Sequence, residues 1–133
     1  MEAGNTAPAR SIFVQTNGDN PGGYGNNYVS RTSGYFIPPT TDHYVFFVDV
    51  DDNADLLLNT NTANGTDPAG KVVIAQQTFW AGLDSWVVSD INGVVGGGNP
   101  PDWNQNRSDS FVDTNGISPG AGGYLLNAGQ LYY

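Results

Sequence analysis

The sequence contains no cysteine, a single histidine (His43) and only four basic residues. Without cysteine there can be no disulfide framework, catalytic thiolate or thiolate-ligated zinc. A single histidine gives little support for a transition-metal site, and no nucleophile-elbow motif is present for a Ser-His-Asp hydrolase. Glycoside hydrolysis needs two carboxylates facing each other across a cleft, whereas the dense carboxylates here are contiguous in sequence. We therefore expect the chain not to be an enzyme.

Positive charge is scarce throughout the chain, which has a formal net charge of −9 at pH 7. Such a surface repels a phosphate backbone, so nucleic acid is excluded as a partner. No apolar run is long enough to span a bilayer and no basic amphipathic helix is visible, so membrane insertion is not expected. Among the thirteen acids only Glu2 is not an aspartate, and this bias fits turns and oxygen-ligand sites better than charged helices.

Strong helix formers are also few, and no long stretch repeats its apolar residues with a helical period. The chain has 18 glycines and 8 prolines, which indicate many turns, and its 38% hydrophobic content is enough for one core. These features predict an all-β fold, an antiparallel β-sandwich. We expect a polar N-terminal arm over residues 1–10 and a single domain over residues 11–133.

The strongest strand signal covers residues 44–50, where β-branched and aromatic residues fill both faces. This pattern predicts a central strand buried on both sides. Residues 34–37 form a shorter apolar run that ends at two prolines, so residues 38–42 are predicted to be the turn of an antiparallel hairpin. Other strands are expected at 11–15, 56–58, 71–76, 87–91, 105–112 and 125–133. The predicted core comprises Tyr35, Ile37, Phe46, Val48, Leu56, Leu58, Val73 and Leu126.

The strand at 44–50 runs into an acidic turn, residues 49–55, which has no basic residue. At an effective dielectric near 20, two like charges about 4 Å apart repel by roughly 4 kcal/mol, so the cluster needs full solvation or a cation. Both interpretations stay open, and the second favours calcium, which takes several carboxylate and carbonyl oxygens. An EF-hand does not fit, because Ala54 and Thr60 stand where that loop needs Gly and Glu. The candidate ligands are Asp49, Asp51, Asp52, Asn53 and Asp55.

A long loop over residues 93–106 contains three consecutive glycines and two consecutive prolines. Loops of this length in compact domains tend to be functional. Within it, Trp103 has few apolar neighbours and is a candidate for stacking on a sugar ring, with Asn104 beside it. Trp80 and Trp86, by contrast, are expected to pack against the core.

The chain resembles the PA14 domain, in the variety found in large secreted bacterial proteins. The resemblance covers roughly residues 24 to 133 and rests on an ordered set of short motifs. These are Arg31, Ser33 to Phe36, Pro38-Pro39, Tyr44, Phe46, Asp51-Asp52, Leu56, Val73-Ile74, Trp80, Arg107 to Asp109, Leu126, Ala128-Gly129 and Tyr132-Tyr133.

The resemblance implies a β-sandwich that often binds carbohydrate. In sugar-binding members, an adjacent Asp pair joined by a cis peptide holds calcium, and sugar hydroxyls complete its coordination. By position these ligands are Asp51 and Asp52. The family's later strand and the Asn-bearing loop that follows have no counterpart before Tyr133, so the sandwich is expected to be incomplete at its C-terminal edge.

The leading hypothesis is therefore a secreted carbohydrate-binding module, active in adhesion at the bacterial cell surface and dependent on calcium. Its partner would be a polysaccharide or glycan. The alternative is a structural or assembly domain of a secreted protein or filament. In that case the open, apolar sheet edge would be completed by a strand from a neighbouring subunit.

Overall fold

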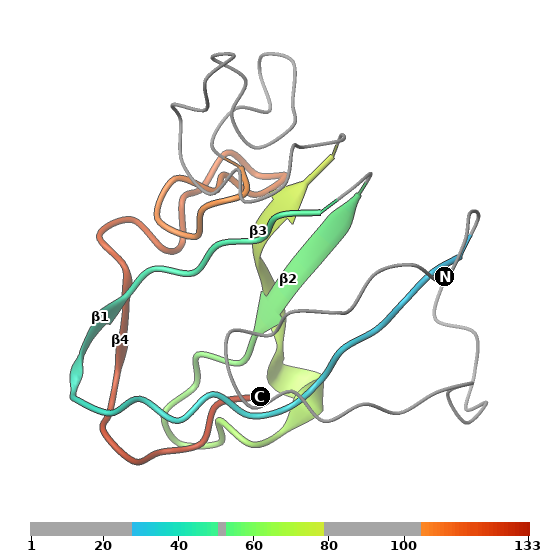
Figure 1. The fold of residues 1–133 in the computed structure, drawn as a ribbon. Coiled ribbons are helices and arrows are strands. Elements are labelled where there is room, and N and C mark those ends of the chain that lie inside the picture. The colour runs from blue at the N-terminus through green and yellow to red at the C-terminus, as the bar shows by residue number, and fades with distance from the viewer. Residues whose placement is uncertain (1–27, 51–52, 79–104) are drawn as a thin grey trace. The chain divides into compact units, whose positions relative to one another are not determined.

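The computed structural model describes residues 28–50, 53–78 and 105–133 (Figure 1). The chain divides into two units, Met1–Ser33 and Gly34–Tyr133. In the first unit the described residues, 28–33, are exposed and contain no strand. The predicted arm at 1–10 and the predicted strands at 11–15 and 87–91 lie outside the described residues, as do Trp80 and Trp86.

The described residues of the second unit form two small antiparallel sheets. Strand β1 (Asp42–Tyr44) pairs with β4 (Tyr124–Leu126), and β2 (Ala54–Leu58) pairs with β3 (Val72–Gln77). A single 3-10 turn, η1 (Pro68–Gly70), precedes β3. No α-helix occurs in the described ranges, and no helix there is long and apolar enough to cross a membrane. The predicted all-β antiparallel fold is confirmed.

Local sequence explains β2 and β3. The apolar run of β2 lies opposite the β-branched run of β3, with Leu57 across from Val73 and Asp55 across from Gln76. An irregularity in register between Leu56 and Leu57 is a β-bulge. The predicted strands at 56–58 and 71–76 are confirmed as β2 and β3. The one predicted at 125–133 is confirmed in part as β4, and the one at 105–112 is reduced to an isolated bridge at Arg107.

The hydrophobic core joins the two sheets. Its buried members come from β2, β3, β4 and the C-terminal residues: Leu58, Ile74, Tyr124, Leu126 and Tyr132. Phe36, Tyr44, Phe46 and Leu56 pack against them and are partly buried. The ring of Phe36 meets the rings of Tyr44 and Phe46 edge-on, at centroid distances of 5.3 and 5.2 Å. Edge-to-face pairs of this kind add to the stabilisation from burial alone.

The hairpin predicted between residues 34–37 and 44–50 is wrong. Phe36 instead exchanges both backbone hydrogen bonds with Tyr132, at 2.8 and 2.9 Å, and β1 pairs with β4. After Phe36 the chain enters two prolines, which lack an N–H and cannot extend a ladder. The carbonyl oxygen of Pro38 accepts a hydrogen bond from Gly129 N–H (2.9 Å), so the segment stays beside the C-terminal residues.

The burial of several predicted core residues is also corrected. Tyr35 and Ile37 are more than half exposed, because Phe36 between them takes the inward position. Leu58 and Leu126 are buried as predicted, whereas Phe46, Val48, Leu56 and Val73 are half-buried. The strand at 44–50 is not buried on both faces, since Val45 is exposed and the others are at most half-buried.

Candidate functional site

The residues that lead into the acidic turn lie along a second segment of chain, residues 105–108. Val48 donates its backbone N–H to the carbonyl oxygen of Asn106 (3.0 Å), and Ser108 donates its N–H to that of Phe46 (2.9 Å). Phe47 and Arg107 face each other as an antiparallel bridge between these bonds. In Figure 1 the segment starting at residue 105 lies at the same end of β2 and β3 as the acidic turn.

Two successive glutamines at the end of β3, Gln76 and Gln77, hold the two sides of the acidic turn, and we call them the glutamine clamp. Gln77 donates its side-chain amide to the carbonyl oxygen of Val50 (2.5 Å), just before the turn's central aspartates. Gln76 donates its side-chain amide to Asp55 Oδ1 (2.7 Å), just after them. The clamp thereby fixes the entry of the turn relative to its exit. Gln76 also donates its backbone N–H to the carbonyl oxygen of Gln105 (2.8 Å).

Arg107 anchors the segment 105–108. Its guanidinium donates to both carboxylate oxygens of Asp109, from Nε at 3.1 Å and from Nη2 at 2.7 Å, and stands over the ring of Phe47 at 5.6 Å. This pair is partly exposed, so its contribution to stability is modest, but a two-bond geometry fixes orientation well. On the other side of the segment, Ser108 Oγ accepts the N–H of Phe46 (2.9 Å).

Asn106 is the unusual member of this segment. Its side chain is only 1% exposed, yet neither its amide oxygen nor its amide nitrogen has a hydrogen-bond partner among the groups described. The register places Asn106 opposite Val48, on the face of the segment that also carries the buried Ser108. Leaving a buried amide unpaired costs about 1–3 kcal/mol. A buried amide without a partner calls for an explanation other than stability, and this one lies beside the acidic turn.

The predicted ligands are only partly placed. Asp51, Asp52, Trp103 and Asn104 lie outside the described residues. Of the others, Asp49 is half-buried and Asn53 is exposed, while Asp55 is exposed and bonded to Gln76. Within the described ranges no group of three His, Cys, Asp or Glu side chains is arranged to hold a metal ion. Because the central aspartate pair is outside those ranges, the complete ligand set stays a prediction.

The donor atoms around the turn are nevertheless of one chemical kind. Asp49 and Asp55 offer carboxylate oxygens, and Asn53 and Asn106 offer amide oxygens. The chain has no cysteine thiolate to offer, and the single histidine lies on β1. An all-oxygen set with several carboxylates suits a hard cation such as calcium and does not suit a transition metal. The residues present at the turn therefore fit calcium.

Sequence reasoning missed the glutamine clamp and Asn106. The clamp had a weak local signal, because two amides interrupt an apolar strand at its end. Asn106 had none, since its burial follows from pairing with residues far away in sequence. The bond between Phe46 and Ser108, for example, spans 62 positions.

Comparison with known families identifies one relationship. The model of the PA14 domain family matches residues 1–116, which include the acidic turn, the glutamine clamp and Asn106. The sequence motifs described above extend beyond this match to Tyr133. No significant match was found among curated proteins or among solved structures.

Proposed function

Because the chain belongs to the PA14 domain family, we propose that it is an extracellular carbohydrate-binding module with a calcium-dependent sugar site at the acidic turn. PA14 domains commonly bind carbohydrate, are generally not enzymes and occur in large secreted bacterial proteins. The observation that carries the finer proposal is the glutamine clamp, which holds a turn rich in carboxylates from both sides.

In this proposal Asp51 and Asp52 are the central calcium ligands. Asp49, Asn53 and Asp55 supply further oxygens or negative charge around them. Bound calcium neutralises the carboxylates and offers coordination positions to the vicinal hydroxyls of a sugar. The clamp contributes pre-organisation, because a turn whose entry and exit are already fixed loses less conformational freedom when it closes around an ion.

Trp103 and Asn104 are proposed to contact the sugar. Asn104 is joined covalently to Gln105, whose carbonyl oxygen accepts the backbone N–H of Gln76 in the clamp. Gln105, the residue that follows Asn104 in the sequence, therefore lies beside the clamp. A tryptophan there can stack on the apolar face of a pyranose while calcium binds its hydroxyls.

The test is calcium titration followed by glycan binding. In isothermal titration calorimetry the chain should bind calcium, and calcium at a hundred times its dissociation constant should stabilise the fold by about 2.7 kcal/mol. Glycan-array binding should appear in calcium and disappear with EGTA. Asp52→Asn should abolish both effects. Asp67→Asn is the matched control: it removes an aspartate charge beside η1, where Asp67 Oδ1 accepts Ala69 N–H and an asparagine oxygen can do the same.

Two outcomes would contradict the proposal. If calcium neither binds nor raises the melting temperature, the acidic turn is a solvated surface feature. If calcium binds but no glycan on the array is retained, the ion is structural. The chain would then be better described as a structural or assembly domain of a secreted protein, which a neighbouring subunit could complete.

A further inference from the structure

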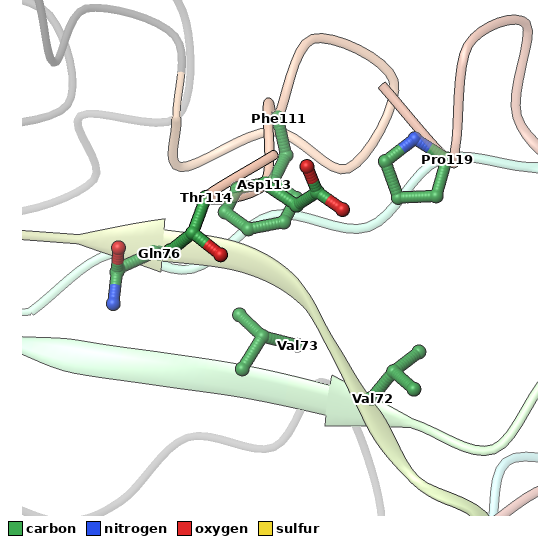
Figure 2. A pocket seen from close by; sticks show the side chains of 7 residues that line it. All are labelled: Val72, Val73, Gln76, Phe111, Asp113, Thr114 and Pro119. Carbon is green, nitrogen blue, oxygen red and sulfur yellow. The ribbon is translucent and has the colours of Figure 1, made fainter. Parts of the chain in front are cut away.

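A pocket of about 370 Å³ lies between β3 and the loop that follows Phe111 (Figure 2). Its apolar walls are Val72 and Val73 from the strand, and Phe111 and Pro119 from the loop. Three polar residues complete the lining: Gln76, Asp113 and Thr114. Figure 2 shows the strand side chains on one side of the pocket and the loop side chains on the other. The volume is within the range of sites that bind small molecules or single side chains.

The loop that forms one wall is held by hydrogen bonds within itself and by one bond to Gln105. Asp113 Oδ1 accepts the backbone N–H groups of Asn115 (2.8 Å) and Ile117 (2.9 Å). Ser118 donates its hydroxyl to the carbonyl oxygen of Phe111 (2.7 Å). Gln105 Oε1 accepts the N–H of Val112 (2.9 Å). These bonds fix the position of the pocket's carboxylate before any ligand arrives, which lowers the entropic cost of binding.

The charge of the lining is one-sided. Among the described residues that line it, Asp113 is the only ionisable one and none is basic. The N–H of Ile117 is the largest cause that lowers the pKa of Asp113 below its ordinary value of 3.8, so the carboxylate is ionised at neutral pH. The Asp113 side chain is partly exposed, and the side chain of Asn115 also stabilises its charged form. Gln76, at the pocket edge, is bonded to a second carboxylate, that of Asp55.

The pocket therefore combines an apolar wall with a fixed negative charge at its rim. Phe111, the aromatic residue of the described lining, is only 6% exposed and offers little ring face for a sugar to stack on. An anion would be repelled by Asp113 and by a net charge of −9. The complementary ligand has a hydrocarbon stem and a cationic head, which is the chemistry of a lysine or arginine side chain.

We propose that this pocket binds a basic side chain, lysine or arginine, presented by a protein partner. The aliphatic stem lies on Val72, Val73 and Pro119, and the cation meets Asp113 Oδ2. Half of the surface of Val72 is exposed in the chain alone, so a partner's stem would cover apolar area that water now contacts. The pocket shares Gln76 with the glutamine clamp, but none of the residues proposed to meet the basic side chain is a proposed calcium ligand.

The proposal can be tested with the full chain by ¹⁵N-resolved NMR titration. The probe is Nα-acetyl-lysine methylamide, whose side-chain ammonium is free. The matched probe is Nα-acetyl-norleucine methylamide, which keeps the aliphatic stem and lacks the charge. Lysine should shift the amide resonances of residues 72–76 and 111–119 saturably. Its dissociation constant should be lower than that of norleucine by a factor of about two to five, as for a partly exposed ion pair.

Three variants distinguish the effect of charge from that of the apolar wall. Asp113→Asn keeps an oxygen for the N–H groups of Asn115 and Ile117 and should make the two probes bind equally. Asp67→Asn removes one negative charge outside the pocket and should leave the preference for lysine intact. Val72→Ala, at a half-exposed position, should weaken both probes alike.

The proposal would be overturned by any of four results. Norleucine could bind as tightly as lysine, which would make the pocket purely apolar. The preference could survive Asp113→Asn, or the lysine probe could shift resonances elsewhere and leave those of the pocket unchanged. If glucose in place of the lysine probe shifted the pocket resonances more strongly, the pocket would be a second carbohydrate site instead.

Discussion

The two ends of the second unit are built on different principles. At one end, which we call the aromatic end, the rings of Phe36, Tyr44, Phe46 and Tyr132 pack on leucine and isoleucine from the strands. At the other, which we call the polar end, the glutamine clamp, Asn106 and the acidic turn take their place. The aromatic end buries apolar area, which stabilises folding. The polar end buries amides, which stabilise it little and position charged groups.

The aromatic end holds most of the buried apolar side chains, whereas the polar end carries the residues of the proposed calcium site. The separation is not complete, because the hydroxyl of Tyr124 in the aromatic end is buried without a protein partner in the described residues, and burial raises its pKa. Segment 105–108 connects the two ends, since Ser108 is bonded to Phe46 while Asn106 lies beside the acidic turn. Removing a buried ring at the aromatic end should lower the free energy of unfolding. Replacing the unpaired buried amide of Asn106 at the polar end with an apolar side chain should raise it.

The largest effect is expected from Tyr132→Ala at the aromatic end. Tyr132 is fully buried, its hydroxyl accepts the N–H of Asn127 (2.9 Å), and its ring belongs to the core cluster. Its removal should lower the free energy of unfolding by about 3–5 kcal/mol, measured by urea denaturation. Tyr35→Ala is the control, because Tyr35 is 53% exposed and meets Tyr133 edge-on at 5.7 Å. Its loss should be about 1 kcal/mol. Equal losses would show that the aromatic end is not the core.

Gly120→Ala should have the next largest effect, because it acts on the connection between the two ends. A Cβ at this position would lie 2.2 Å from the carbonyl oxygen of Ser108 and 2.7 Å from Tyr124 Cε2. Relieving that overlap requires the backbone of segment 105–108 to shift, at a cost of roughly 1–3 kcal/mol. Gly34→Ala is the matched control, since nothing lies within 4 Å of its Cβ. This variant should change the free energy of unfolding by no more than about 0.5 kcal/mol. A neutral Gly120→Ala would mean that the segment is loosely held.

The sequence was sufficient for features that depend on neighbouring residues. The apolar runs of β2 and β3 have the right period and composition, and the acidic turn between strands is visible as consecutive letters. The prediction of a hairpin failed because it relied on a local turn signal at two prolines. That signal does not reveal that Phe36 pairs with Tyr132, near the other end of the chain. The prediction that Tyr35 and Ile37 are buried, rather than Phe36 between them, failed for the same reason. A short apolar run can present either face until its partner strand is known.

The candidate site divides in the same way. The carboxylates were predictable from composition and spacing alone. Their support was not, because the glutamine clamp acts across the β2–β3 pairing and Asn106 acts across a bridge between distant segments. Asn106 was also part of a sequon, Asn106-Arg107-Ser108, whose pattern gives no hint that the amide is buried.

A smaller effect, of opposite sign, is expected at the polar end. Asn106→Leu replaces an unpaired buried amide with an apolar side chain of similar size. In EGTA it should raise the free energy of unfolding by about 1 kcal/mol. Ser108→Ala is the control from the same segment and with the same burial, but its hydroxyl accepts the N–H of Phe46. That variant should lose about 1–3 kcal/mol. If Asn106→Leu destabilised the fold as much as Ser108→Ala, its amide would be bonded and the contrast between the ends would be weaker.

The smallest effect concerns acid stability at Asp113, beside the pocket. Hydrogen bonds from Ile117 and Asn115 lower the pKa of this carboxyl from its ordinary value of 3.8, so folding favours the charged form. The resulting stabilisation is present above the unfolded pKa and is lost as the pH falls through the lower, folded pKa. Wild type and Asp113→Asn should therefore differ slightly in denaturation midpoint near neutral pH, with wild type more stable. The difference should shrink as the pH falls below about 4, where the unfolded carboxyl binds its proton first. Urea midpoints across this range measure it. A difference that did not change with pH would show that the hydrogen bonds favour neither protonation state of Asp113.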